Sequence, residues 1–269
     1  MPPAMLAPGL GVLVGLVLAL TGAGGAILAV PLLVFGLHLS MAQAGPVGLL
    51  AVALAAGLGA VLGWRSRVLR YKAAGLMALA GGLASPFGLW LAHRVPNGPL
   101  TFVFAGVLGV VAWRMLSQAS RELRGETVAA PKAPPCRLNP VLGRLQWNAA
   151  CARALVMAGA GAGFLSGLLG VGGGFIIVPT LLAVSDLSMK AVIATSMGVL
   201  ALVSAVGVFN AGVAGYMPWN LAWPFGAGAV AGLVIGRMFA ARVAGPRLRQ
   251  GFALLSLGIA ASLLAKLAL

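Results

Sequence analysis

The residues best placed to do chemistry in this sequence are glycines, because titratable side chains are nearly absent from its apolar segments. Residues 167–182 read GLLGVGGGFIIVPTLL, with glycines at Gly170, Gly172, Gly173 and Gly174. A helix that restarts after this break has first amides without partners inside the helix, and these carry partial positive charge. Glycine leaves such amides open to a ligand. The segment therefore predicts a small-anion site built from the backbone.

A weaker copy of this segment lies 148 residues earlier. It includes LALTGAGGAILAVPLL at residues 18–33, and a proline follows each glycine cluster at the same distance, Pro31 in the first copy and Pro179 in the second. Without a gap, nine of the twenty residues from Gly22 to Met41 are identical to their counterparts, which indicates an internal repeat. The binding positions predicted in the first copy are Thr21, Gly22, Gly24 and Gly25.

Two interpretations of these glycines stay open, anion binding and close packing of helices. A glycine cluster that recurs with its proline at equal spacing favours binding, with the two prolines in a structural role at the break. Thr195 and Ser196 lie in the apolar helix after the second cluster. Their hydroxyls either face the ligand or bond back to their own helix, and we include both residues in the predicted site.

The other reactive residues predict no catalytic group and no metal site. Asp186 is the only acid within either apolar half, and we expect it to cap the helix that follows. Ser166 has no histidine expected near it, so it lacks the base that a nucleophile needs. Cys136 and Cys151 form no CxxC motif and have no neighbouring histidine, which predicts reduced thiols. We expect no cofactor and no enzyme activity.

The composition indicates a chain that lies mostly in lipid. Of 269 residues, 61% are hydrophobic and 8% are charged, and the mean hydropathy is +1.06. Apolar runs of about 18 residues or more recur along the chain, which predicts an all-α polytopic membrane protein. The net charge of +15 does not indicate a nucleic-acid partner, because the basic residues cluster between apolar runs. The expected partners are the bilayer and a small anion, with the oligomeric state left open.

Charge also divides the chain and orients it. Residues 117–153 form a basic linker between membrane repeats at 1–116 and 154–269. Basic segments of membrane proteins tend to be cytoplasmic. If each glycine-broken segment enters the membrane and returns to the same side, all three basic segments are cytoplasmic: this linker, the loop Arg65–Lys72 and the segment Arg237–Arg249. Both termini then lie outside, and each repeat is a re-entrant hairpin plus three crossings, in inverted orientation. One long, kinked helix per half is the alternative.

The two glycine-rich segments and the basic linker resemble the sulfite exporter TauE/SafE family of membrane permeases over nearly the whole chain. Ala26 departs from the motif, since it stands in place of a third glycine. The resemblance implies transport of sulfite, sulfonates such as sulfoacetate, or related organic anions across the cell membrane. Export is favoured, because a negative interior drives an anion outward by about 2.3 kcal/mol per charge per 100 mV. Transport coupled to protons or sodium, and a non-transporting scaffold, are the alternatives.

Overall fold

A computed structural model describes residues 3–21, 25–124, 134–137, 145, 147–243 and 246–268 of the protein. Ten helices make up this described part, and its β-structure is limited to isolated bridges, which confirms the all-α prediction. The helices are α1 (Pro3–Thr21), α2 (Gly25–Gly36), α3 (Met41–Arg65), α4 (Tyr71–Arg94), α5 (Asn97–Leu123), α6 (Ala149–Leu169), α7 (Gly174–Val184), α8 (Met189–Val213), α9 (Trp219–Val243) and α10 (Pro246–Ala268).

Six of the described helices, α3, α4, α5, α6, α8 and α9, are long and apolar enough to cross a bilayer. Their outward faces are apolar as well. On α4, Leu79, Leu83 and Phe87 follow one another at one-turn spacing and are 70%, 75% and 69% exposed. A stripe of that kind would drive aggregation in water, whereas acyl chains solvate it in a membrane. The prediction of a polytopic helical membrane protein is confirmed.

The helix boundaries repeat along the chain. Helices α3 and α8 begin 148 residues apart (189 minus 41) and end 148 residues apart (213 minus 65). Each begins at a serine N-cap, Ser40 or Ser188, whose side chain accepts a backbone N–H from the first turn. The expectation that Asp186 caps the second of these helices is wrong, since Ser188 takes that place and Asp186 lies exposed just before it.

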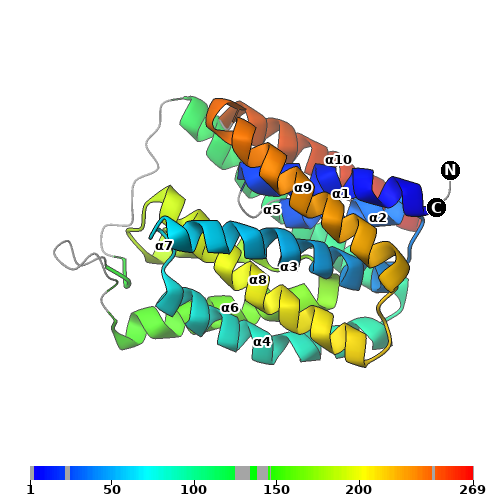
Figure 1. The fold of residues 1–269 in the computed structure, drawn as a ribbon, viewed down its shortest axis with the longest axis horizontal. Helices are drawn as coiled ribbons and strands as arrows, with labels where there is room; N and C mark the ends of the chain where they lie inside the picture. The colour runs from blue at the N-terminus through cyan, green and yellow to red at the C-terminus, as the bar shows by residue number, and fades with distance from the viewer. Residues whose placement is uncertain are drawn as a thin grey trace.

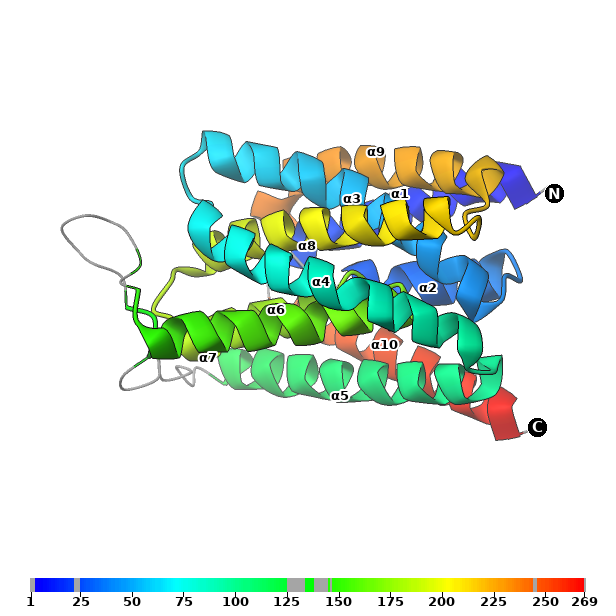
Figure 2. The same ribbon diagram turned by 90° about the horizontal axis from the view of Figure 1, so that it is seen from below.

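Two helix pairs, α1 with α2 and α6 with α7, fold back on themselves. Figures 1 and 2 show both termini at one end of the bundle, with the end of α5 and the start of α6 at the opposite end. The long helices run between these ends, while α7, with 11 residues, returns to the end where α6 began. Helix α5 continues to Leu123 and α6 begins at Ala149, so helix occupies both edges of the predicted linker range 117–153.

Small residues hold the main helix pairs in contact. On α1, Gly11 and Gly15 lie against the backbone of α9 so closely that a Cβ on either glycine would collide with it. The equivalent positions on α6, Gly159 and Gly163, lie in the same way against the backbone of α4. Close backbone approach through small residues is the usual basis of helix association in lipid. Packing therefore explains these glycines, which lie outside the predicted site.

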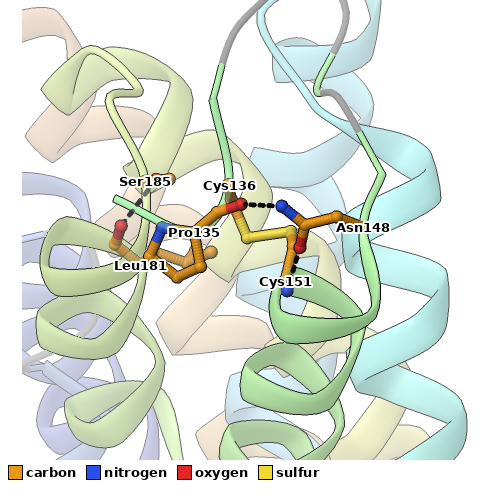
Figure 3. Close-up of a disulfide and its surroundings, with 6 residues drawn as sticks. All are labelled: Pro135, Cys136, Asn148, Cys151, Leu181 and Ser185. Carbon is orange, nitrogen blue, oxygen red and sulfur yellow. Dashed lines mark hydrogen bonds between the residues drawn. A yellow bond between two sulfur atoms is a disulfide. The ribbon is translucent and has the colours of Figure 1, made fainter. Parts of the chain in front are cut away.

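Cys136 and Cys151 form a disulfide, so the prediction of two reduced thiols is wrong. The N–H of Cys136 donates to the carbonyl of Val184 at 2.9 Å, and Cys151 lies in the first turn of α6. Figure 3 shows Asn148 beside the bond, where its side chain accepts from the Cys151 amide and donates to the Pro135 carbonyl. The disulfide and this hydrogen bond together connect the start of α6 to the end of α7 through Cys136.

Candidate anion-binding site

The turn between α6 and α7 has a backbone that favours glycine at three positions. Gly170, Gly172 and Gly173 have φ values of 71°, 72° and 69°, in the left-handed region that L side chains rarely adopt. Gly170 closes α6, and its N–H donates to the Ser166 carbonyl at 2.9 Å. Gly173 is the N-cap of α7. The glycines therefore stop one helix and start the next within four residues.

The start of α7 presents buried amides without partners. Residues 171–174 are all buried. The first bonds of α7 run from the amides of Ile176 and Ile177 to the Gly173 carbonyl. None of the hydrogen bonds between the described residues has the amide of Gly172, Gly173 or Gly174 as its donor. Because buried amides without partners are rare and unfavourable, and a helix start attracts negative charge, this edge of the backbone is suited to an anion.

Helices α3 and α8 enclose this turn. A Cβ on Gly172 would lie 2.9 Å from Val52, 3.0 Å from Leu200 and 3.1 Å from the hydroxyl oxygen of Ser204. A Cβ on Gly170 would collide with the backbone of Gly45 on α3. The turn is thus packed closely between apolar side chains, one hydroxyl and the backbone of α3.

The two hairpins approach each other next to Gly48 on α3. A Cβ on Gly48 would lie 3.1 Å from the Gly170 carbonyl oxygen and 3.4 Å from Cβ of Ala29 on α2. The structure therefore brings the start of α2 near the second glycine break. Of the predicted first-copy residues, Thr21 ends α1 and Gly25 begins α2, while Gly22 and Gly24 lie outside the described residues.

The prolines of the two copies lie inside the returning helices. Pro31 is within α2 and Pro179 is within α7. Each lacks an N–H, so each leaves the carbonyl four residues earlier, on Ile27 or Phe175, without its usual helical partner. The proline weakens the helix soon after each break, which fits the structural role predicted for both residues.

Thr195 and Ser196 have partners away from the break. The Thr195 hydroxyl accepts the backbone N–H of Arg70 at 3.1 Å, at the end of the bundle where α4 begins. The Ser196 hydroxyl donates to the Ile193 carbonyl at 2.9 Å, within its own helix. Ser204, which contacts the break, lies nine residues after Thr195, or about 14 Å along α8. The structure therefore does not bring Thr195 and Ser196 together with the glycines.

Three serines that the sequence analysis did not assign to the site lie near the break instead. Ser85 on α4, Ser166 on α6 and Ser204 on α8 are each 0% exposed. Their hydroxyl oxygens have no hydrogen-bond partner among the described residues. Polar groups at membrane depth are costly and are commonly functional. In the sequence, only their position in the middle of an apolar helix could have marked these serines as site residues. Serine is too common in membrane helices for that position to distinguish a binding residue from a packing residue.

Formal charge is remote from the break along these helices. Basic residues occur near the linker ends of α4, α6 and α8, at Lys72, Arg153 and Lys190, each 13 or 14 residues before the buried serine on the same helix. That spacing corresponds to about 20 Å, and Arg94, nine residues after Ser85 at the other end of α4, lies about 14 Å along the helix from it. The described residues contain no group of three His, Cys, Asp or Glu side chains that could hold a metal ion. Any anion at the break is therefore held by dipoles, namely amides and hydroxyls.

Comparison with known proteins connects this architecture to transport. A family profile described as "Sulfite exporter TauE/SafE" matches residues 7–263, which include both hairpins. Two curated relatives, from Xylella fastidiosa strains 9a5c and Temecula1, are each described as "Probable membrane transporter protein". Each is 28% identical over 257 residues, which cover 94% of this chain and 91% of the relative. No solved structure matches the chain.

Proposed function

The chain belongs to the sulfite exporter TauE/SafE family, and from that premise we propose that it exports small sulfur-containing or organic anions. Sulfite and sulfonates are the substrate classes that the family suggests. The chain is a membrane transporter and not an enzyme, as its family and its relatives show. The substrate, the direction and the route through the protein are the subject of the proposal.

The observation that carries the proposal is the buried amide edge at Gly172–Gly174. Three consecutive amides that have no partner among the described residues would be unfavourable in a protein interior. In a membrane they are tolerated only where protein or an aqueous cavity accommodates them. A transported anion would supply the missing acceptors. The packing glycines of α1 and α6 differ from those of this turn, because they lie in regular helix, whereas Gly170, Gly172 and Gly173 have positive φ values.

The repeat architecture supplies a route for alternating access. We propose that residues 1–116 and 154–269 are inverted repeats around a central site, joined by a linker at 117–153. The equal offsets of α3 and α8 and the approach of both hairpins to Gly48 support this arrangement. The basic loop Arg65–Lys72 lies at the same end of the bundle as the end of α5 and the start of α6, which supports a cytoplasmic linker and external termini in the cell membrane.

Membrane potential favours outward movement of the anion. The described parts of the helices around the break hold no acid that could carry a coupled proton. Facilitated export driven by the potential therefore needs the fewest components. Coupling to sodium or protons is the second candidate, because the carbonyl end of α6 faces the same turn and could hold a cation.

The experiment that tests the proposal measures anion flux with purified protein in liposomes. Vesicles loaded with methanesulfonate, sulfite or a small carboxylate should lose the anion faster than protein-free vesicles. Saturation of the rate with anion concentration would indicate a binding site rather than a leak. A folded protein that moves none of these anions would contradict transport of this substrate class. That result would favour the alternative of a non-transporting scaffold.

A further inference from the structure

We propose that Ser85, Ser166 and Ser204 donate their hydroxyl hydrogens to the transported anion, and that the site they form accepts a singly charged oxyanion and rejects a dianion. The inference rests on the proposed transport of small anions through the glycine break. It adds specific side-chain donors, and it assigns the charge state of the substrate.

The three hydroxyls differ from four other serine hydroxyls that lie within helices or at their ends. Those of Ser117, Ser185, Ser196 and Ser262 donate to a carbonyl three or four residues earlier, at 2.6–2.9 Å. That bond is open to every serine in a helix. Ser85, Ser166 and Ser204 do not make it, although all three are fully buried. Their hydroxyls are therefore buried hydrogen-bond donors between helices. Burying a hydroxyl without a hydrogen-bond partner costs free energy, and a bound anion would remove that cost.

The helices that carry these serines meet around the break. Ser204 faces Gly172, as the 3.1 Å approach shows, and the Ser85 hydroxyl lies 3.6 Å from the position of a Cβ on Gly207, one turn after Ser204. Gly167, next to Ser166, packs against the carbonyl of Ser85. Helices α4, α6 and α8 thus present one hydroxyl each at the level where the amides of α7 begin.

A site of this composition discriminates by charge. Its donors are neutral hydroxyls and amides. The backbone of Arg70 lies at the end of the bundle where α4 begins, and its N–H donates to Thr195, about 14 Å along α8 from Ser204. The cost of moving an ion out of water grows with the square of its charge, so a dianion costs about four times as much as a monoanion of equal size. Hydroxyl and amide dipoles can offset the smaller cost. A sulfonate with a single charge or a hydrogensulfite ion fits, since its oxygens accept several such donors. Sulfate and a doubly charged sulfonate such as sulfoacetate do not fit, because of their second charge.

The test compares methanesulfonate with sulfate, in the wild type and in serine variants. Ser85→Ala, Ser166→Ala and Ser204→Ala should each weaken methanesulfonate binding by about 10- to 100-fold, the effect of one hydrogen bond to a charged group. Ser196→Ala is the matched control, because that buried serine on α8 already bonds to its own helix. Binding is measured by calorimetry in detergent, beside the melting temperature of each variant. Alanine removes only an unused donor from the empty site, so the melting temperature should not fall.

The possible results separate this inference from the proposed function. Weaker binding in the three serine variants, with wild-type binding in Ser196→Ala, supports the hydroxyl site. Wild-type binding and flux in all three variants would overturn it and leave anion transport standing. Sulfate moved by the wild type as fast as methanesulfonate would overturn the charge rule without any mutation. A wild type that moves neither anion would defeat the proposed function itself.

Discussion

The hydroxyl oxygen of Ser204 on α8 lies 3.1 Å from the position that a Cβ on Gly172 would take, so the glycine break and a buried donor share one small space. The pair joins segments 32 residues apart in the chain (204 minus 172). It connects the backbone site predicted from the glycines with a side chain that only the folded protein brings to it.

Gly172→Ala should block transport with a moderate loss of stability. Its methyl group would enter the space between Val52, Leu200 and Ser204, and the left-handed backbone adds about 1–2 kcal/mol of strain. We expect at least a tenfold loss of methanesulfonate flux in proteoliposomes. Gly161→Ala is the control, because Gly161 is exposed on α6 with nothing within 4 Å. That change should stabilise the helix by about 0.5–1 kcal/mol and leave flux unchanged. Normal flux in Gly172→Ala would place the anion elsewhere.

Breaking the disulfide should destabilise the second hairpin. Cys136 and Cys151 are 15 residues apart, and closing a loop of that size contributes about 3 kcal/mol by restricting the unfolded chain. Reductant should therefore lower the melting temperature of the wild type. The double variant Cys136→Ser/Cys151→Ser should start at the lower value and not respond to reductant. In the proposed orientation the bond faces the reducing cytosol, so protein from rapidly quenched cells should carry more free thiol than protein purified in air.

The proposed orientation predicts which positions an impermeant thiol reagent can reach. In a background without the native cysteines, Ala214→Cys should react in intact cells. Ala214 is exposed and is the C-cap of α8, a helix that ends on the side of the bundle that holds the termini. Arg137→Cys is exposed at the opposite end and should react only after permeabilisation. Labelling of both positions from outside would contradict the re-entrant arrangement. Labelling of Arg137→Cys alone in intact cells would show that the protein has the opposite orientation in the membrane.

An inside-negative potential should accelerate efflux of methanesulfonate without any ion gradient. The potential contributes about 2.3 kcal/mol per charge per 100 mV, which corresponds to about a 50-fold change in the equilibrium concentration ratio. The measurement imposes a potassium diffusion potential at equal pH and in the absence of sodium. A strict requirement for a proton or sodium gradient would exclude the uncoupled mechanism and favour the coupled alternative.

Sulfite flux should fall as pH rises, whereas methanesulfonate flux should stay constant. Above its second ionisation sulfite loses the proton of hydrogensulfite and becomes a dianion, the charge state that the serine site is expected to reject. The helices α4, α6 and α8 carry their titratable side chains near their ends, as at Lys72, His93, Arg153 and Lys190. Protein ionisation near the break is therefore not expected to change the flux. Equal sulfite rates across the second ionisation would contradict the charge rule.

Several features could be predicted because they depend only on neighbouring residues. Hydropathy identifies a helix that lipid can solvate, and a glycine cluster identifies a backbone that leaves the helix, whatever the rest of the fold does. The offset of 148 residues could be counted directly, and α3 and α8 begin and end at that offset. Ser188 took the capping position expected for Asp186, because a shift of two residues along a turn is decided by the entry angle of the chain.

The donors around the break and the disulfide required the tertiary structure. Ser85, Ser166 and Ser204 come from three helices, and whether each hydroxyl bonds to its own helix or faces a neighbour depends on how those helices rotate and cross. The same packing gives Thr195 a partner in the loop before α4. Cys136 meets Cys151 because it pairs with Val184 at the end of α7. The sequence alone determined which segments enter the membrane and where their helices break, because both depend on the free energies of neighbouring residues. Which side chains lie together was decided by the tertiary structure, because that depends on how segments remote in the chain pack.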